Sequence, residues 1–196
     1  MQVSHETIYS YIYVLGRGEL KKELMKYLRR EHKKRRVQGH SQKGQTANLP
    51  EMLSIEERPK EVEDRIIPGH WEGDIIIGGR MEQSAMGTLV ERTTRTVLLV
   101  PLKNKTAEEV RKAFTREIKK LPEQMRLTLT YDQGREMAQH KLFTKNTKMK
   151  VYFAHPRSPW ERGTNENTNG LIRQFFPKGT NFREVSRYRI KRVQHL

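Results

Sequence analysis

The chain has 196 residues, 34% hydrophobic and 32% charged, which is enough for one good-sized domain with a modest core plus an appendage. Its 39 Lys and Arg against 23 Asp and Glu give a net charge of +16, which favours nucleic acid as partner, although ribosomal or membrane-surface proteins carry similar charge. The absence of cysteine excludes a disulfide framework and a thiolate metal site. No apolar run approaches the length of a membrane span or a signal region, so an intracellular, DNA-associated location is expected.

The first 36 residues predict two helices and a basic run. Ser4 can cap a helix over residues 4–13 that carries an apolar face, and residues 20–28 predict a basic amphipathic helix. Residues 29–36 are a run of charges, and such runs often bind phosphates without sequence preference. Its basic members are therefore candidate DNA ligands: Arg29, Arg30, Lys33, Lys34, Arg35 and Arg36.

Residues 37–65 predict a linker. Gly, Gln, Ser and Asn dominate up to Leu49, and a stretch of mixed charge around Pro59 is typical of a surface connection. The folded domain is therefore expected to cover residues 66–196.

Three strands are predicted at the start of that domain. Residues 70–77 are almost continuously apolar and end at two glycines, which indicates a central strand covered on both faces. Asp74 lies within this strand, and a buried carboxylate must be paired or bound to metal. Residues 84–91 and 96–102 predict a hairpin.

Helices and strands alternate in the next part of the chain. Thr106 to Glu109 has the sequence of a capping box, and apolar residues at helical spacing follow it as far as Leu121. Residues 127–132 predict a strand with Asp132 at its carboxyl end, where α/β sheets usually place ligands. Further predictions are a helix over 135–146, a strand over 149–154 and a basic helix beginning near Arg183.

Residues 154–173 predict a proline-rich loop that opens into a helix. Thr164 is the expected N-cap, and apolar residues recur at helical spacing at Leu171, Ile172, Phe175 and Phe176. Glu166 falls in the first turn, and Arg173 follows two turns later on nearly the same face. Spacing alone favours an ordinary capped surface helix.

The sequence of this helix nevertheless resembles a known family. Thr-Asn-Glu-Asn-Thr-Asn-Gly (residues 164–170) and Arg-Gln-Phe-Phe-Pro-Lys-Gly-Thr (residues 173–180) resemble bacterial insertion-sequence transposases of the "IS thirty" type. The resemblance covers nearly the whole chain and is strongest over residues 69–180. It implies an α/β, ribonuclease H-like fold: a five-stranded mixed sheet flanked by helices, with a basic helical N-terminal appendage. In the implied sheet the first three strands are antiparallel, and the fourth and fifth run parallel to the first. Three positions depart from the family pattern: Gln133 for Asn, Met137 for Phe and Glu161 for Gln.

The resemblance also implies a site and an activity. Asp74, Asp132 and Glu166 map onto the family's triad of acids, which binds two Mg²⁺ or Mn²⁺ ions and catalyses cleavage at transposon ends and joining of the 3′-hydroxyl to target DNA. Arg162, Arg173 and Lys178 are expected to contact DNA. The first helix resembles the last helix of a helix-turn-helix whose preceding helices are absent; the alternative is that it simply packs on the core. Such enzymes work on DNA as homo-oligomers in the bacterial cytoplasm, at the nucleoid.

Alternatives remain at the level of residues and of function. Glu72 and Glu136 are possible substitute metal ligands, and His155 is either a phosphate contact or structural. Trp71 and Trp160 are interpreted as core or loop anchors. The chain could instead be a catalytically silent, basic DNA-binding remnant, or a ribonuclease H-like nuclease without joining activity. Metal-dependent strand transfer would separate these functions.

Overall fold

The computed structural model describes residues 3–16, 18–28, 51–79 and 84–195. The chain divides into two compact units, Met1–Lys43 and Gly44–Leu196. The predicted basic run over residues 29–36 and the glycine-rich part of the predicted linker lie outside the described residues. No helix in the described ranges is long and apolar enough to cross a membrane.

The first unit contains the two predicted helices, α1 (His5–Val14) and α2 (Glu19–Lys26). Ser4 caps α1, because its side chain accepts a hydrogen bond from the backbone N–H of Thr7 at 3.2 Å. Lys21 ties α2 to the end of α1 by donating to the carbonyl oxygens of Tyr13 and Leu15, at 3.0 and 2.8 Å. These contacts satisfy carbonyls that the end of a helix leaves without partners.

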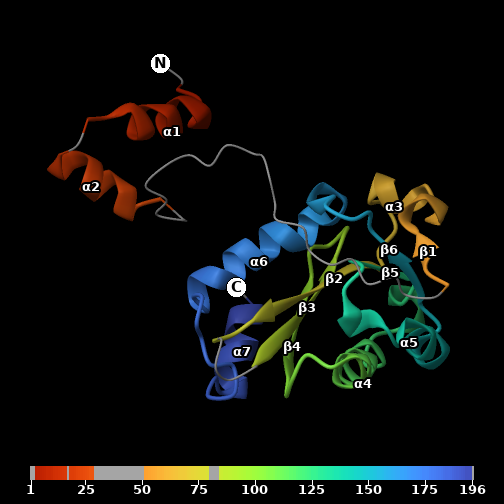
Figure 1. The fold of residues 1–196 in the computed structure, drawn as a ribbon. Coiled ribbons are helices and arrows are strands. Elements are labelled where there is room, and N and C mark those ends of the chain that lie inside the picture. The colour runs from red at the N-terminus through yellow and green to blue at the C-terminus, as the bar shows by residue number, and fades with distance from the viewer. Residues whose placement is uncertain (1–2, 17, 29–50, 80–83, 196) are drawn as a thin grey trace. The chain divides into compact units, whose positions relative to one another are not determined.

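The second unit is built on a mixed sheet with the strand order β1-β6-β5-β2-β3-β4 (Figure 1). The strands are β1 (Leu53–Ser54), β2 (His70–Ile77), β3 (Ala85–Glu91), β4 (Val97–Leu102), β5 (Thr128–Tyr131) and β6 (Lys150–Phe153). As predicted, β2, β3 and β4 are antiparallel neighbours, while β5 and β6 run parallel to β2.

The sheet has six strands, so the expectation of five was wrong. The sixth, β1, pairs in parallel with β6 and lies inside the stretch predicted as linker. The predicted boundary at Ile66 therefore does not coincide with the first element of the sheet. A strand of two residues shows no alternation of polar and apolar side chains, so the sequence carries no signal for it.

Five helices of the second unit accompany the sheet: α3 (Glu61–Asp64), α4 (Ala107–Ile118), α5 (His140–Thr147), α6 (Gly163–Phe175) and α7 (Arg187–Gln194). Two begin later than the sequence predicts. A 3-10 helix over Arg135–Met137 precedes α5, and α7 starts after Ser186, whose side chain caps it. Thr106 caps α4 as predicted, but the side chain of Glu109 accepts from Lys103 N–H, so the capping box is only half formed.

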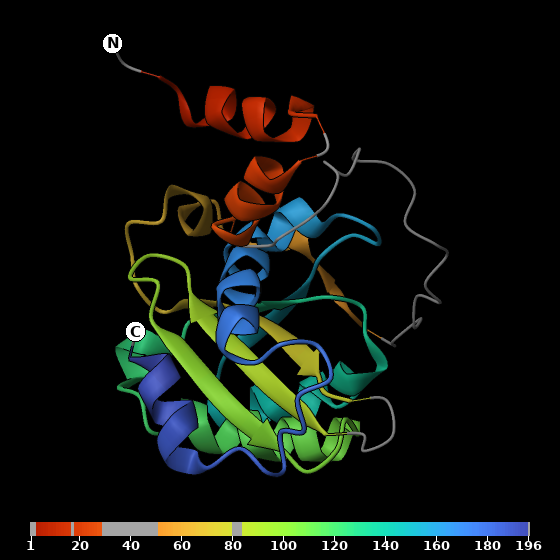
Figure 2. The same cartoon turned by 90° about the vertical axis from the view of Figure 1, so that its left-hand side faces the viewer.

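The helices cover both faces of the sheet. Helices α4 and α5 lie on one face, and α6 and α7 lie on the other, in front of the strands in Figure 2. Because side chains alternate along a strand, β2 sends Trp71 into the core beneath α4 and α5, and Ile76 into a second core with α6 and α7. Asp74 lies two residues before Ile76, so its side chain is on the same face of the sheet, the face that α6 covers.

Strand β4 forms one edge of the sheet. It pairs with β3 alone, and its Leu99 N–H donates to the side chain of Gln194 in α7 at 2.9 Å. Pro101 lies two residues further along β4, so its nitrogen faces the same way as that of Leu99. Proline has no N–H to offer there.

Candidate active site

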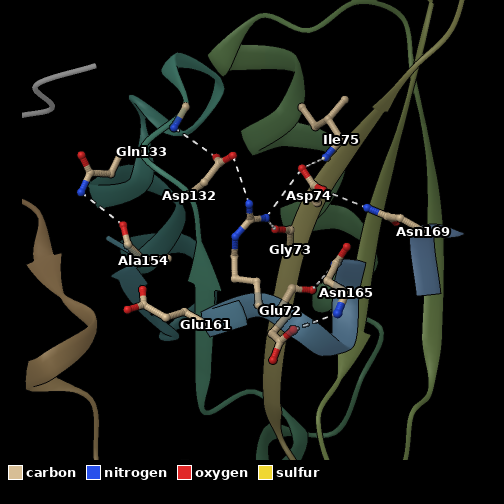
Figure 3. Close-up of polar contacts among 12 residues, drawn as sticks. Glu72, Gly73, Asp74, Ile75, Asp132, Gln133, Ala154, Glu161, Asn165 and Asn169 are labelled. Carbon is tan, nitrogen blue, oxygen red and sulfur yellow. Dashed lines mark hydrogen bonds and ion pairs between the residues drawn. The ribbon is translucent and has the colours of Figure 1, made fainter. Parts of the chain in front are cut away.

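The register of the central strands brings two acids together. Strand β2 pairs in parallel with β5, with Glu72 opposite Thr130. Asp74 and Asp132 each follow two residues later, so they occupy equivalent positions, Asp74 within β2 and Asp132 directly after the carboxyl end of β5. Figure 3 shows their carboxylates turned toward a common space in front of the two strands.

The guanidinium of Arg162 bridges these two acids. Its Nη2 donates to Asp132 Oδ2 at 3.3 Å, and its Nη1 lies 3.7 Å from Asp74 Oδ1. Nη1 also donates to the carbonyl oxygen of Gly73 at 3.1 Å. The arginine side chain is only 11% exposed, so it faces inward and not toward the solvent, where we expected it to meet DNA.

Further donors orient the same carboxylates. Asp74 accepts from the backbone N–H of Ile75 and from the side chain of Asn169 in α6, both at 2.8 Å. Asp132 accepts from the backbone N–H of Gly134 at 3.1 Å. Each acid is thus held by its own strand or turn, and Asp74 is held by α6 as well.

Electrostatics links the third predicted acid to the other two. Burial raises the pKa of the Asp74 carboxyl, and the negative charges of Asp132 and Glu166 raise that pKa further. Arg162 and the Ile75 N–H act in the opposite direction. Asn165 and Asn169 of α6 bond to Glu72 and Asp74, so the first turn of α6 lies on the same side of the sheet as Asp74.

A buried polar network fixes the start of α6. Asn165 donates its backbone N–H to Glu72 Oε2 and its side-chain amide to the Glu72 carbonyl oxygen, both at 2.8 Å. The Thr88 hydroxyl donates to Asn165 Oδ1 at 3.2 Å, and Arg92 pairs with Glu72 Oε1 at 3.1 Å. Glu72, proposed from sequence as a substitute ligand, is therefore engaged in placing the helix.

The helix starts differently from the prediction. A 3-10 helix over Pro159–Arg162 leads directly into α6, and Arg162 occupies the N-cap position without a side-chain cap. Thr164 was therefore the wrong N-cap, and it is buried within the first turn. The network around Asn165 does the anchoring that a cap would otherwise provide.

Glu166 is exposed in the first turn of α6, between Asn165 and Asn169. Within the described ranges, no three or more His, Asp or Glu side chains are close enough together to hold a metal ion. The space between Asp74 and Asp132 instead holds the cation of Arg162. Two carboxylates that already share a cation fit Mg²⁺ or Mn²⁺, because these ions prefer hard oxygen ligands.

The remaining predicted residues lie around this centre. Arg173 donates to the carbonyl oxygen of Ile77 at the end of β2, at 2.8 Å, and burial lowers the pKa of its guanidinium. Lys178 is exposed beyond α6. Burial raises the pKa of the Glu136 carboxyl, and the charges of Asp132 and Asp74 raise it further, so Glu136 stays a possible ligand.

His155 and the two tryptophans differ in their surroundings. His155 Nδ1 lies 2.8 Å from Glu161 Oε1, and the backbone N–H of His155 donates to the same carboxylate. These contacts favour the structural role of His155 over a phosphate contact. Trp71 is fully buried and donates to Met125, as expected of an anchor. Trp160 is 73% exposed, so its interpretation as an anchor was wrong, because its 3-10 helix lies at the surface.

Sequence reasoning missed Asn165 and Asn169 as functional residues. They lie four positions apart, so they share one face of α6, which is the face against β2. Two asparagines at this spacing beside a proposed catalytic acid are the signal that could have identified them.

Comparison with known proteins identifies the domain. The integrase core domain model matches residues 65–159, which include Asp74 and Asp132. The transposase of IS1086 from Cupriavidus metallidurans is 52% identical over 182 residues, covering 92% of this chain and 52% of that protein. The InsI transposase of IS30A from Escherichia coli K12 is 41% identical over 195 residues, covering 98% of this chain and 50% of that protein. The chain thus spans about half the length of these curated relatives.

Solved structures agree on the fold. The simian T-cell lymphotropic virus intasome, in complex with the PP2A regulatory subunit B56 gamma, contains a chain that aligns with a TM-score of 0.54 at 16% identity, over 65% of this chain and 48% of that one. The HTLV-2 integrase catalytic core domain, in complex with magnesium, aligns with a TM-score of 0.50 at 19% identity, over 66% of this chain and 84% of that one. The fold is therefore the ribonuclease H-like one of retroviral integrase cores. The chain contains an integrase core domain, and over most of its length it is homologous to insertion-sequence transposases of the IS30 type.

Proposed function

We propose that this chain is the catalytic part of a DNA transposase, which cleaves phosphodiester bonds at transposon ends and joins the freed 3′-hydroxyl to target DNA. The observation that carries the proposal is the placement of Asp74 and Asp132 around one cation, from equivalent positions on two neighbouring parallel strands. The names of the relatives, transposases of insertion sequences, support it.

Asp74 and Asp132 would hold the divalent cations, with Glu166 as the third ligand. Bound Mg²⁺ or Mn²⁺ would activate a water or a DNA 3′-hydroxyl and stabilise the leaving oxygen. The chain itself orients the ligands. Asn169 fixes one oxygen of Asp74, and Asn165 sets the position of the helix turn that carries Glu166.

The DNA would lie along the basic residues near this centre. Arg173 and Lys178, at and beyond the end of α6, are the proposed phosphate contacts, together with the run of arginines and lysines at residues 29–36. Such contacts position DNA without reading its sequence. We also propose that the chain acts as a homo-oligomer on transposon ends and target, at the bacterial nucleoid; one viral relative in the structural comparison is described as a trimeric form.

A nicking and joining assay tests the proposal. Asp74→Asn, Asp132→Asn and Glu166→Gln should each lower Mn²⁺-dependent nicking of a labelled end duplex by more than about 100-fold, since even partners of metal ligands are worth 10–100-fold. DNA binding should stay intact or strengthen, because each change removes a charge that repels phosphate. Glu123→Gln, an exposed glutamate paired with Lys148, is the matched control and should retain activity.

The outcomes separate the alternatives. Nicking without transfer of the 3′-hydroxyl would indicate a nuclease. DNA binding without any metal-dependent nicking would indicate a silent remnant. Full nicking by Glu166→Gln with none by Glu136→Gln would assign the third ligand to Glu136.

A further inference from the structure

The two aspartates need a compensating charge whenever no metal is bound. Asp74 is partly buried, and its charge is close enough to that of Asp132 for the two to repel each other. Among the ion pairs of the described residues, Arg162 is the one cation that contacts either acid. Two close carboxylates in a region of low dielectric are strongly unfavourable without such a partner.

The arginine uses the oxygens that a metal would require. Asp132 Oδ1 is taken by the Gly134 N–H, while Oδ2 has Arg162 as its hydrogen-bond partner in the described part of the chain. On Asp74, Oδ2 is held by Asn169, and Oδ1 accepts from the Ile75 N–H and has Arg162 Nη1 at 3.7 Å. A divalent cation shared by both acids would therefore meet the guanidinium at the same oxygens.

We propose that Arg162 is an internal cation that offsets part of the negative charge of Asp74 and Asp132 in the metal-free protein and competes with the divalent cation for them. This inference rests on the proposed function of the two acids as metal ligands. The donation from Nη1 to the Gly73 carbonyl, which does not depend on the acids, keeps the guanidinium beside them. Arg162 occupies the N-cap position of α6, about one helical turn before Glu166. If a metal ion displaced the Arg162 side chain, the change would therefore occur at the start of this helix.

Thermodynamic linkage predicts the direction in which the metal affinity changes when Arg162 is replaced. A residue that stabilises the metal-free site lowers the affinity for the metal, and removing that residue raises the affinity by the same coupling. Arg162→Gln should therefore bind Mn²⁺ about fivefold or more tightly than wild type, the lower end of typical coupling between sites. Its thermal midpoint in EDTA should fall, because the repulsion between the acids is no longer offset.

The experiment measures free Mn²⁺ by electron paramagnetic resonance during titration of the full chain without DNA. Arg173→Gln is the matched control, because it removes the same charge from an arginine that donates to backbone carbonyls and contacts neither aspartate. Its Mn²⁺ affinity should stay close to wild type. Arg162→Lys, which keeps the charge but loses the forked geometry, should fall between wild type and Arg162→Gln.

A second measurement avoids metal altogether. In EDTA, Arg162→Gln should lower the thermal midpoint less in an Asp74→Asn background than in wild type, because one of the two repelling charges is already gone. Equal losses in both backgrounds would overturn the inference. If Arg162→Gln alone is poorly folded by circular dichroism, the Mn²⁺ affinity of Arg162→Lys, which should exceed that of wild type, tests the inference in its place.

The results distinguish this inference from the proposed function. Unchanged or weaker Mn²⁺ binding by Arg162→Gln, with normal binding by wild type, would overturn the inference alone and make Arg162 an organiser of the metal site. Failure of the wild-type chain to bind Mn²⁺ would overturn the metal site, and the competition with it.

Discussion

The two faces of the central strands differ in the kind of side chain that they bury. On the face beneath α4 and α5, Trp71, Leu129 and Phe114 are fully buried and apolar. On the face beneath α6, Glu72, Thr88 and Asn165 are equally buried, yet they are polar and bonded to one another. One strand, β2, supplies both faces by alternation, so one set of its side chains stabilises the sheet while the other places a helix.

The difference shows how a fold can position a reactive helix. Apolar packing is non-directional, and it tolerates small shifts of a helix over a sheet. A buried carboxylate that accepts a helix N–H has a defined partner, and losing that partner is costly. The network of Glu72, Arg92 and Asn165 therefore fixes where α6 begins, and with it the position of Glu166.

The largest expected effect is the loss of stability caused by a substitution in the apolar face. Phe114→Ala should lower the free energy of unfolding by about 3–5 kcal/mol, a typical cost for a large aromatic residue in a core. The ring covers Gly87, where an added Cβ would lie 2.2 Å from it, so little is available nearby to refill the space. Urea unfolding measures the loss.

This variant should leave the site as it is. Below the unfolding transition, the rate of Mn²⁺-dependent nicking per folded molecule should match wild type. A large fall in that rate would show that the two faces are not separable.

A smaller loss of stability but a larger loss of activity is expected on the polar face. Asn165→Ala removes the side-chain bonds to Glu72 and Thr88 but keeps the backbone N–H, so it should cost about 1–3 kcal/mol of unfolding free energy. Nicking should fall because the turn that carries Glu166 loses its fixed position. Urea unfolding and nicking, measured on the same preparation, give both quantities.

Thr168→Ala is the control for this prediction. Its hydroxyl bonds back to the Thr164 carbonyl within α6, and it should change nicking little. Full activity of Asn165→Ala despite lower stability would contradict the positioning role and reduce the network to a structural one.

The smallest effect is expected outside both faces, at the loop before α6. The hydrogen bond from His155 to Glu161 raises the pKa of the histidine, and the negative charge of Glu161 adds to the shift. A raised pKa in the folded state means that protonated His155 stabilises the protein below the unfolded pKa of about 6.5, and that this stabilisation disappears as pH rises through the folded pKa.

His155→Gln should therefore lower the thermal midpoint at pH 5.5 and leave it nearly unchanged at pH 9. The shift should be smaller than those of Phe114→Ala and Asn165→Ala, because the pair is exposed to solvent. An equal shift at both pH values would indicate that the charge plays no part.

The sequence predicted the elements whose signals are local. Apolar runs located β2, β3 and β4, and helical spacing located α4. The resemblance assigned Asp74 and Asp132 to one site, and their common contact with Arg162 agrees with that assignment. The role of Glu166 came from the resemblance alone, and it stays a prediction.

The rest could not be read from the sequence because it depends on distant partners. The contact between Asn165 and Glu72 joins residues 93 positions apart, and that between Arg162 and Gly73 joins residues 89 apart. In a basic protein, an arginine such as Arg162 is expected to contact DNA. The packing of the turn before α6, which the sequence does not reveal, directs its side chain toward Asp74 and Asp132 instead. Strand β1 is too short to have a pattern of its own.

The edge strand β4 has a consequence for how copies of this protein can associate. An unpaired strand edge invites another strand to add to it, and proteins block such addition with prolines or covering groups. Here one outward N–H of β4 is occupied by Gln194, and the next position facing that way is Pro101. A strand from a second molecule would find no N–H available at either of these two positions. Extension of the sheet into a fibre is therefore disfavoured at this edge.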